Sequence, residues 1–220
     1  MFDYAILDTA IEKAIPPAHK VVNGSNNAHS VFKRLFDVVF SILLLPILVT
    51  AALVLLVLNP FLNPGRLFFS QKRMGRDCVP FTAYKFRSMR AVPEIRRGAD
   101  APLEQDRITP LGGFLRKTRI DELPQVINVL RGEMSLIGPR PDYYDHAVHF
   151  LSEIPGYRER HMVRPGISGL AQTEVGYAEG VEATRRKVRA DLYYITHASI
   201  RLELWILWRT LFVIFKRGGA

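Results

Sequence analysis

Two neighbouring carboxylates, Asp121 and Glu122, are the residues of this chain best placed to do chemistry. Pro124 follows them closely, and because proline lacks an N–H it fits the first turn of a helix and not the interior. Asp121 is a good N-cap residue for that helix, and Gly132 ends the apolar pattern, so we expect a helix of about 9–11 residues. Acidic side chains at a helix start complement the helix dipole, so capping alone would explain the pair.

Basic side chains on stiff turns occur on both sides of this segment. Arg140 lies between two prolines, and Arg164 precedes Pro165 and two nearby glycines. Arginine binds phosphate oxygens through two parallel hydrogen bonds, and a stiff turn lowers the entropy lost on binding. Any one of these cations is more commonly a surface residue, but several beside a carboxylate pair indicate a site for phosphate groups. The candidate phosphate-binding or nucleotide-binding side chains are Lys85, Arg87, Arg116, Arg140 and Arg164.

The composition favours an anionic partner. The 220 residues carry a formal net charge of +9, from 30 Lys and Arg against 21 Asp and Glu. Nucleic acid, an acidic membrane face or a phosphorylated substrate would each suit that charge. Cys78 is the only cysteine, which excludes an intramolecular disulfide and a metal site built on cysteines. The sequence contains no Walker A loop, dinucleotide fingerprint or G-x-S-x-G elbow.

Residues 38–58 are almost purely apolar. As a helix this run would be roughly 30 Å long, enough to span the hydrocarbon core of a bilayer. Pro46 lies near its middle and should kink or break the helix. Positive charge, which marks the cytoplasmic side, flanks the run at both ends and begins with Lys33 and Arg34. A helix that breaks and returns to the same face and a kinked spanning helix both stay open; Asp37 could pair with one of the two cations or cap the helix.

The remaining patterns predict a helix-dominated α+β protein. Residues 1–30 are polar and lack a signal-peptide pattern, so we expect a loosely ordered tail, followed by the membrane segment at residues 31–62 and a mixed domain at residues 63–220. Two tryptophans and terminal cations near the C-terminus favour a helix in the membrane interface over one packed on the core. The expected elements are two strands at about 67–69 and 81–86, which would form a hairpin around a turn at residues 74–77, and helices at about 111–117, 142–154, 181–195 and 200–217.

Taken in order, these segments resemble the bacterial sugar transferases called monotopic phosphoglycosyl transferases. The match covers about residues 31–217, and so many strings in family order make it highly specific. The strings are Lys33-Arg34-x-x-Asp37, Gln71-x-Arg73-x-Gly75, Lys85-Phe86-Arg87-Ser88-Met89, Leu115-Arg116, Asp121-Glu122-Leu123-Pro124-Gln125, Asn128-Val129-Leu130-x-Gly132, Met134-Ser135-x-x-Gly138-Pro139-Arg140-Pro141, Arg164-Pro165-Gly166-x-x-Gly169-Leu170-x-Gln172 and Asp191-x-x-Tyr194-Ile195.

The resemblance implies transfer of a sugar phosphate from a nucleotide diphosphate sugar, usually a uridine one, to a polyprenyl phosphate in the membrane. In the family the aspartate of the pair is the nucleophile, here Asp121, which would form an acyl phosphate that the lipid phosphate resolves. The family uses Mg²⁺, expected near Asp121, with Arg116 and Arg140 helping to neutralise charge. Glu122 is expected to orient the metal or to assist proton movement.

The resemblance also implies a membrane arrangement. The hydrophobic segment of the family is a re-entrant helix–break–helix with its break at a proline, here Pro46. Residues 63–220 would then form a catalytic domain, ending in an interfacial helix, on the cytoplasmic face of the bacterial inner membrane. Residues Thr173 to Tyr177 depart from the pattern of the family, so the sugar cannot be carried over. The sequence also leaves open whether the protein forms a homodimer.

Two other readings of the sequence compete with this one. A non-catalytic membrane scaffold could bind polyprenyl or acidic lipids through its basic residues, but it would have no need of carboxylates among its cations. A membrane-tethered nucleic-acid binder rests on net charge alone. No reading helix or aromatic stacking sheet is recognisable, so we expect no nucleic-acid partner.

Overall fold

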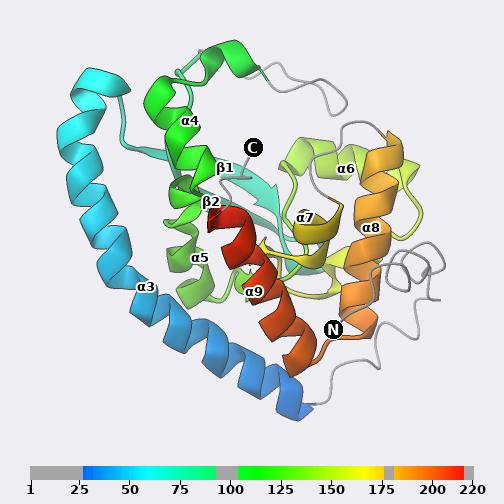
Figure 1. Cartoon of the computed structure of the whole chain (residues 1–220). Helices are drawn as coiled ribbons and strands as arrows, with labels where there is room; N and C mark the ends of the chain where they lie inside the picture. Colours follow the sequence, from blue (N-terminus) through cyan, green and yellow to red (C-terminus); the bar gives the residue numbers. More distant parts are fainter. Residues whose placement is uncertain (1–26, 93–103, 176–180, 216–220) are drawn as a thin grey trace.

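The computed structural model describes residues 27–92, 104–175 and 181–215. As expected, these residues form a helix-dominated α+β fold with one long apolar helix and small sheets (Figure 1). The predicted tail, residues 1–30, lies almost wholly outside the described residues. The elements are α3 (Asn27–Leu62), β1 (Phe68–Met74), β2 (Pro80–Phe86), α4 (Pro110–Lys117), α5 (Gln125–Arg131), β3 (Ser135–Ile137), α6 (Tyr144–Glu153), β4 (Gly166–Ser168), α7 (Leu170–Glu174), α8 (Val181–Thr196) and α9 (Ile200–Phe215).

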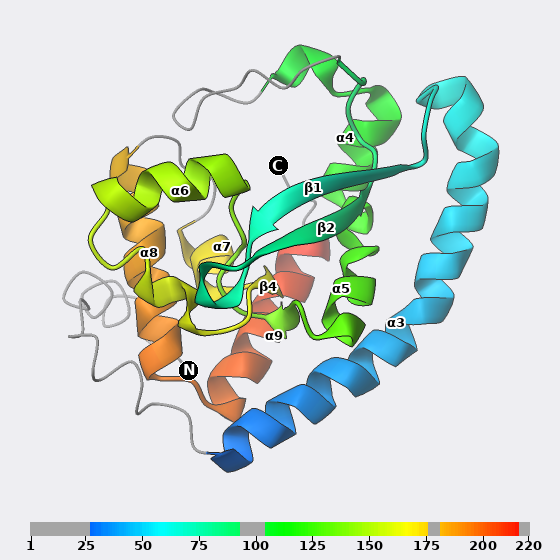
Figure 2. The same cartoon turned by 180° about the vertical axis from the view of Figure 1, so that it is seen from behind.

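The long helix α3 contains both Pro46 and Pro60 and runs through them without interruption. The predicted break at Pro46 is therefore wrong. An apolar helix tolerates proline when the adjoining turns and nearby hydroxyls adjust to the lost hydrogen bond, and here the hydroxyl of Thr50 donates to the carbonyl of Pro46 at 2.9 Å. Figures 1 and 2 show α3 as a curved rod along one side of the molecule, so the helix bends and does not end.

One face of α3 packs on the protein and the opposite face is exposed. The inward residues Asp37, Ser41, Leu48, Leu55 and Asn59 recur at spacings of four and seven, and all are buried. The outward face is a row of exposed Val, Leu, Ile and Phe side chains. Within the described part of the chain, this is the one helix long and apolar enough to cross a membrane, judged by length and composition. A continuous exposed apolar face of this kind marks contact with lipid or another apolar partner.

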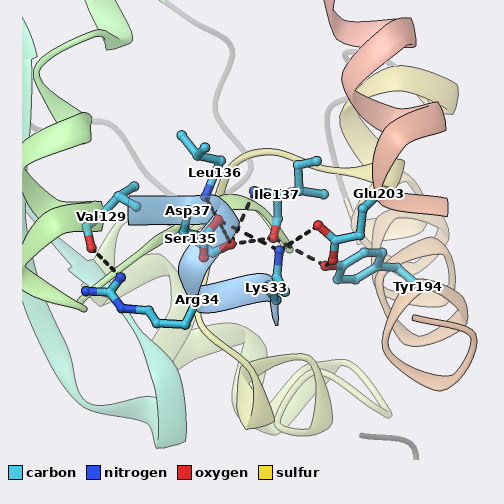
Figure 3. Close-up of polar contacts among 9 residues, drawn as sticks. All are labelled: Lys33, Arg34, Asp37, Val129, Ser135, Leu136, Ile137, Tyr194 and Glu203. Carbon is cyan, nitrogen blue, oxygen red and sulfur yellow. Dashed lines mark hydrogen bonds and ion pairs between the residues drawn. The ribbon is translucent and has the colours of Figure 1, made fainter. Parts of the chain in front are cut away.

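The N-terminal end of α3 is fastened by a group of polar side chains, Lys33, Asp37, Ser135, Tyr194 and Glu203, which we call the anchor cluster (Figure 3). Oδ1 of Asp37 accepts hydrogen bonds from the hydroxyl of Ser135 and from the next backbone N–H, both at 3.0 Å. Glu203 accepts from Nζ of Lys33 at 2.7 Å and from the hydroxyl of Tyr194 at 2.6 Å. Lys33 also lies 4.0 Å from Asp37, which confirms the predicted pairing. The cluster joins α3 to β3, α8 and α9.

Arg34 adds a second attachment at the same end of α3. Its guanidinium donates to the carbonyls of Val129 at 2.7 Å and Leu130 at 3.1 Å. These carbonyls belong to the last turn of α5, where a cation complements the negative end of the helix dipole. The two predicted membrane-boundary cations therefore hold α3 against the domain.

The C-terminal end of α3 is bound to the same domain. The side-chain amide of Asn63 donates to the carbonyl of Arg87 at 2.8 Å, and that of Asn59 donates to the carbonyl of Gly65 at 2.7 Å. The guanidinium of Arg87 in turn donates to the carbonyls of Asn63 and Arg66. Both ends of one 36-residue helix are thus held by polar contacts with one globular body.

The predicted hairpin is confirmed, with a longer first strand than expected. β1 and β2 pair antiparallel from Phe68 opposite Phe86 to Met74 opposite Pro80. Asn128 of α5 extends this pairing, because its side chain accepts from the N–H of Tyr84 at 3.1 Å and donates to the carbonyl of Thr82 at 2.7 Å. Asn128 therefore joins α5 to the hairpin that carries Lys85.

The two turns rich in glycine and proline pack on each other. β3 and β4 pair in parallel just before and within these turns. The backbone N–H of Gly138 donates to the carbonyl of Ser168 at 2.8 Å. A Cβ atom at Gly166 would lie 2.1 Å from the backbone nitrogen of Gly138, so this crossing requires glycine. The two glycines that follow Arg164, at positions 166 and 169, are thus explained by a close approach of two backbone segments.

Helices α8 and α9 complete the core. Leu202 and Ile206 of α9 are buried, whereas Ile200, Leu204 and Trp208 on its other face are exposed. The helix therefore packs on the core with one face and offers an apolar stripe with the other. Its contact with the membrane interface stays a prediction. The N-terminal ends of α3 and α9 lie side by side, where Lys33 meets Glu203 (Figures 1 and 2).

Candidate functional site

The carboxylate pair lies in a 3₁₀ turn, Ile120–Glu122, and not at the N-cap of a helix. Arg119 before it adopts a left-handed conformation, with φ of 59°, that turns the chain sharply after α4. α5 begins only at Gln125 and has 7 residues, so the prediction that Asp121 caps a helix of 9–11 residues is wrong. Gly132 ends α5 in the left-handed conformation, as predicted. The tight turn buries both carboxylates, which a solvent-exposed N-cap would not do.

Glu122 is held by three cations. Arg140 approaches it with two guanidinium nitrogens, one of them 3.2 Å from Oε2, in the bidentate geometry that arginine prefers. Nζ of Lys85 lies 2.7 Å from Oε1, and Nη1 of Arg119 lies 3.5 Å from Oε2. Every oxygen of this carboxylate therefore has a cationic partner.

This surrounding charge decides the ionisation of Glu122. Burial alone would raise the pKa of its carboxyl, but Arg140 and Lys85 outweigh burial and hold the pKa well below its usual range. Burial also lowers the pKa of Lys85, an effect that the Glu122 charge opposes. Glu122 is thus a permanent anion whose oxygens are already occupied, which makes it a poor proton carrier.

Asp121, one residue earlier, is placed differently. Its Oδ1 atom is buried and has no hydrogen-bond partner among the described residues. Burial raises the pKa of the Asp121 carboxyl, and the adjacent Glu122 charge raises it further, while Lys85, Arg140 and Arg116 lower it to a lesser extent. An unpaired buried carboxylate oxygen is costly, and Oδ1 of Asp191 is a second example. Oδ1 of Asp121 differs because the cations that adjoin it include Arg116, whose own Nε is unpaired, and this combination points to a ligand or a reaction at this atom.

Arg116 is the second incomplete group of the site. Nη1 contacts the sulfur of Met89 at 3.9 Å, and Nε is buried without a partner within residues 27–92, 104–175 and 181–215. The side chain nonetheless acts on the charge of Asp121. A buried unpaired donor beside a buried unpaired acceptor suits a ligand that carries both an anionic and an electrophilic part.

The described residues could hold a magnesium ion with only one carboxylate as a protein ligand. In the described segments no group of three or more His, Cys, Asp and Glu side chains is placed to hold a metal ion. Mg²⁺ is commonly bound by one or two carboxylates together with water and the phosphates of a substrate, so one carboxylate is enough. The unpaired oxygen of Asp121 is the atom that fits this role, because Glu122 is fully engaged.

The structure brings together Lys85, Arg116 and Arg140 around the carboxylate pair, as predicted. It places Arg87 and Arg164 elsewhere. The guanidinium of Arg87 donates to backbone carbonyls at the end of α3, and Nε of Arg164 donates to the carbonyl of Gly132 at 2.8 Å. Their assignment as phosphate ligands stays a prediction that this geometry does not favour.

Sequence reasoning missed Arg119 as a partner of Glu122 and missed Arg160 altogether. Arg160 is buried behind the turn that carries Arg140 and donates to the carbonyl of Arg140 at 2.9 Å. Neither residue stands on a turn rich in proline or glycine, which was the signal that selected Arg140 and Arg164. A buried arginine can be recognised only from its carboxylate partners, and these come from distant segments.

Comparison with known proteins identifies the family of this chain. The family model described as bacterial sugar transferase matches residues 28–217, so the chain belongs to the bacterial sugar transferase family. Among its relatives is the UDP-N-acetylgalactosamine-undecaprenyl-phosphate N-acetylgalactosaminephosphotransferase of Aeromonas hydrophila, 42% identical over 87% of this chain and 45% of the relative. The UDP-glucose:undecaprenyl-phosphate glucose-1-phosphate transferase of Klebsiella pneumoniae is 37% identical over 100% of this chain and 48% of its own length.

The chain spans about half the length of these two curated relatives. A relative of similar size is the exopolysaccharide production protein PSS of Rhizobium leguminosarum bv. phaseoli, which is 36% identical over 86% of this chain and 97% of the relative. The names of these relatives specify different sugars, so the family membership does not by itself fix a donor.

Proposed function

We propose that this protein is a phosphoglycosyl transferase that moves a sugar 1-phosphate from a UDP-sugar to undecaprenyl phosphate and releases UMP. The observation that carries the proposal is the contrast within the carboxylate pair. Glu122 is saturated by cations, while Oδ1 of Asp121, beside the same cations, is buried and unpaired. The names of the Aeromonas hydrophila and Klebsiella pneumoniae relatives specify a UDP-sugar and undecaprenyl phosphate, which supports the substrate class.

The reaction proceeds by two displacements at one phosphorus atom. The Asp121 carboxylate attacks the sugar-bearing phosphorus, the bond from that phosphorus to the bridging oxygen breaks, and UMP departs with the oxygen. An oxygen of the acceptor phosphate then attacks the same phosphorus, which breaks the acyl phosphate and restores the carboxylate. A covalent intermediate of this kind replaces one difficult displacement with two easier ones.

The cations neutralise the charge that would otherwise repel a carboxylate from a diphosphate. Lys85 and Arg140 are held by Glu122 and so are positioned before any substrate arrives. Arg116 has a free buried donor for a phosphate oxygen. A bound Mg²⁺, held by Asp121 and the phosphates of the donor, would supply further charge neutralisation. Glu122 keeps these cations in place and takes no part in proton transfer.

We infer that α3 enters and leaves the membrane on the cytoplasmic side. The support is that Lys33 and Asp37 at one end, and Asn59 and Asn63 at the other, make polar contacts with the same domain. A helix that spans the bilayer would separate its ends by about 30 Å of hydrocarbon. The reaction then takes place at the cytoplasmic face, at the depth of the lipid phosphate, as a step of exopolysaccharide or related glycan assembly.

The activity is tested with purified protein in detergent, Mg²⁺ and undecaprenyl phosphate. UDP-N-acetylgalactosamine, UDP-glucose and UDP-galactose are supplied in separate reactions, and UMP release is measured. At least one donor should yield UMP in repeated turnovers that require the acceptor. Binding of undecaprenyl phosphate with no UMP from any donor would instead support the membrane scaffold, which is the alternative that the sequence left open.

The topology is tested by single cysteines in a Cys78→Ser background. Val31→Cys and Arg66→Cys introduce exposed thiols at the two ends of α3. An impermeant maleimide should label neither thiol in intact spheroplasts and both after permeabilisation. Labelling of one thiol from outside would mean a spanning helix.

A further inference from the structure

The turn that carries Arg140 is fixed along its whole length. Four consecutive carbonyls, from Pro139 to Asp142, each accept a hydrogen bond. The donors for the first, third and fourth are the N–H of Gly166, the guanidinium of Arg73 and the N–H of Met74, at 2.9–3.1 Å. The donor for the second, the carbonyl of Arg140 itself, is Nη2 of Arg160 at 2.9 Å.

Arg160 is built into the core and is not a surface side chain that happens to reach the turn. Its exposure is 3%, and its guanidinium also pairs with two carboxylates. Nε donates to Oδ2 of Asp191 on α8 at 2.9 Å, and Nη1 pairs with Asp142 at the end of the turn. The hydroxyl of Tyr157 donates to the same Asp142 oxygen at 2.7 Å. Arg160 therefore ties the Arg140 turn to α8 at two points.

Stability alone does not account for this arrangement. Burying an arginine with two carboxylates is often no more stabilising than packing apolar side chains of similar size. What the group does supply is a defined place for the backbone of Arg140, whose side chain makes a two-pronged contact with Glu122. A contact of this kind tolerates little displacement, because both hydrogen bonds must form together.

We propose that Arg160 is a positioning residue for the transfer reaction: it acts through the backbone of Arg140 and thereby sets the Arg140–Glu122 pair beside Asp121. The inference rests on the proposed function, since it assigns a role in that reaction. Asp142, Tyr157 and Asp191 belong to the same device, because they fix the guanidinium of Arg160.

A double-mutant cycle tests the proposal with the full-length protein. Arg160→Lys keeps the charge and loses the fork of donors, and it is measured in the wild-type background and in an Arg140→Lys background. We expect Arg160→Lys alone to lower kcat about 10-fold, with a smaller change in the KM for the donor. In the Arg140→Lys background the same change should lower kcat by less than about 2-fold, because the effects of two residues that act through the same contact are not additive.

Equal losses in both backgrounds, or a kcat for Arg160→Lys equal to that of wild type, would overturn the proposal. Arg107→Lys is the matched control, because Arg107 also pairs with a carboxylate, that of Glu104, and donates to a backbone carbonyl, that of Arg90. Its effect should not depend on Arg140. If Arg160→Lys fails to fold, Tyr157→Phe removes one hydrogen bond from Asp142 and should show the same coupling at smaller amplitude; additivity there would equally contradict the role.

The wild-type assay separates this proposal from the function on which it rests. If the wild-type protein releases no UMP from any donor, the proposed function fails. If the wild-type protein turns over and the cycle is additive, the function stands and the role of Arg160 is wrong.

Discussion

Two polar clusters among the described residues each contain an aspartate, a glutamate and a lysine, and they differ in whether the buried aspartate oxygen is paired. The anchor cluster has one aspartate, one glutamate and one lysine, Asp37, Glu203 and Lys33, and so does the candidate site, with Asp121, Glu122 and Lys85. In the anchor cluster Oδ1 of Asp37 accepts two hydrogen bonds. In the candidate site Oδ1 of Asp121 is buried and accepts none from the described residues.

This difference distinguishes the two clusters. The anchor cluster keeps Oδ1 of Asp37 paired, and an unpaired buried atom costs about 1–3 kcal/mol. Oδ1 of Asp191 and Oδ1 of Asn63 are also buried and unpaired, so the comparison rests on the cations around Asp121 as well as on its missing partner. The candidate site accepts that cost at Asp121 and at Nε of Arg116, next to cations that Glu122 keeps in place. These two unpaired atoms lie where we propose that the substrate binds and reacts.

The largest expected effect comes from Asp121→Asn, which removes the nucleophile and keeps its shape. UMP release should fall by at least about 10³-fold. Thermal unfolding in detergent should be unchanged or shifted to higher temperature, because the change removes a buried charge whose oxygen has no partner. A variant that keeps near wild-type turnover, or that loses turnover only because it unfolds, would contradict the assignment.

Glu122→Gln tests whether this residue holds the cations. The neutral amide cannot keep Lys85 and Arg140 in place, so we expect kcat to fall by about 10²-fold. The acid limb of the pH–rate profile should survive in this variant. If the acid limb disappeared in this variant, Glu122 would carry a proton in the reaction. Glu122 would then differ from Glu203, which holds Lys33 in the anchor cluster.

The pH profile should show a raised pKa at Asp121. Attack requires the ionised carboxyl, so activity should fall as the pH drops through a value above 3.8, the ordinary value for this group. Glu122→Gln removes a like charge and should move this limb to lower pH, whereas Arg116→Gln should move it to higher pH. If the acid limb moved in the same direction in both variants, the result would contradict these charge contacts.

The same shift has a consequence for stability with a defined sign. Because the folded pKa of Asp121 is raised, the unfolded chain releases this proton first as the pH rises. Asp121 therefore lowers stability as the pH rises from the ordinary aspartate value through the raised one. Asp121→Asn should remove this loss, which unfolding curves at several pH values would detect as a flatter dependence.

Asp37→Asn is the matching change in the anchor cluster and should have the opposite outcome. It weakens two hydrogen bonds to a charged acceptor, so we expect the free energy of unfolding to fall by about 1.5–3 kcal/mol. Turnover per folded molecule should stay close to wild type. A loss of turnover without a loss of stability would mean that the anchor cluster takes part in the reaction.

Tyr194→Phe should give the smallest effect. It removes the hydroxyl that donates to Glu203 at 2.6 Å, which should cost about 0.5–1.5 kcal/mol of stability. Tyr193→Phe is the control at the neighbouring position, where the ring stacks on His197. Equal effects at the two positions would show that the anchor contact contributes nothing specific.

Local patterns were enough to predict much of the fold. The short strand-like runs on either side of the turn at residue 75 predicted the hairpin, Gly132 marked a helix end, and the run at residues 38–58 marked the long apolar helix. The patterns were too short for β3 and β4, which have three residues each and depend on glycine contacts across the molecule. Pro46 gave the wrong answer because proline weakens a helix without necessarily ending it.

The candidate site could be predicted only in part for a related reason. The types and spacing of Lys85, Arg116 and Arg140 indicated phosphate chemistry, and the structure gathers all three. The same reasoning selected Arg87 and Arg164, which resemble the others in sequence but bind backbone carbonyls. Whether a cation meets a carboxylate or a carbonyl depends on tertiary contacts, which a sequence pattern does not encode.

The central claim is that Asp121 is the nucleophile, and the most direct test is to trap its covalent intermediate. The protein is mixed with a UDP-sugar labelled in the sugar-bearing phosphate, without acceptor, and then analysed by intact mass and peptide mapping. The account predicts one sugar phosphate per chain on the peptide that contains Asp121, lost in Asp121→Asn and released by undecaprenyl phosphate. Label on Glu122, or turnover with acceptor from a protein that never carries label, would contradict it.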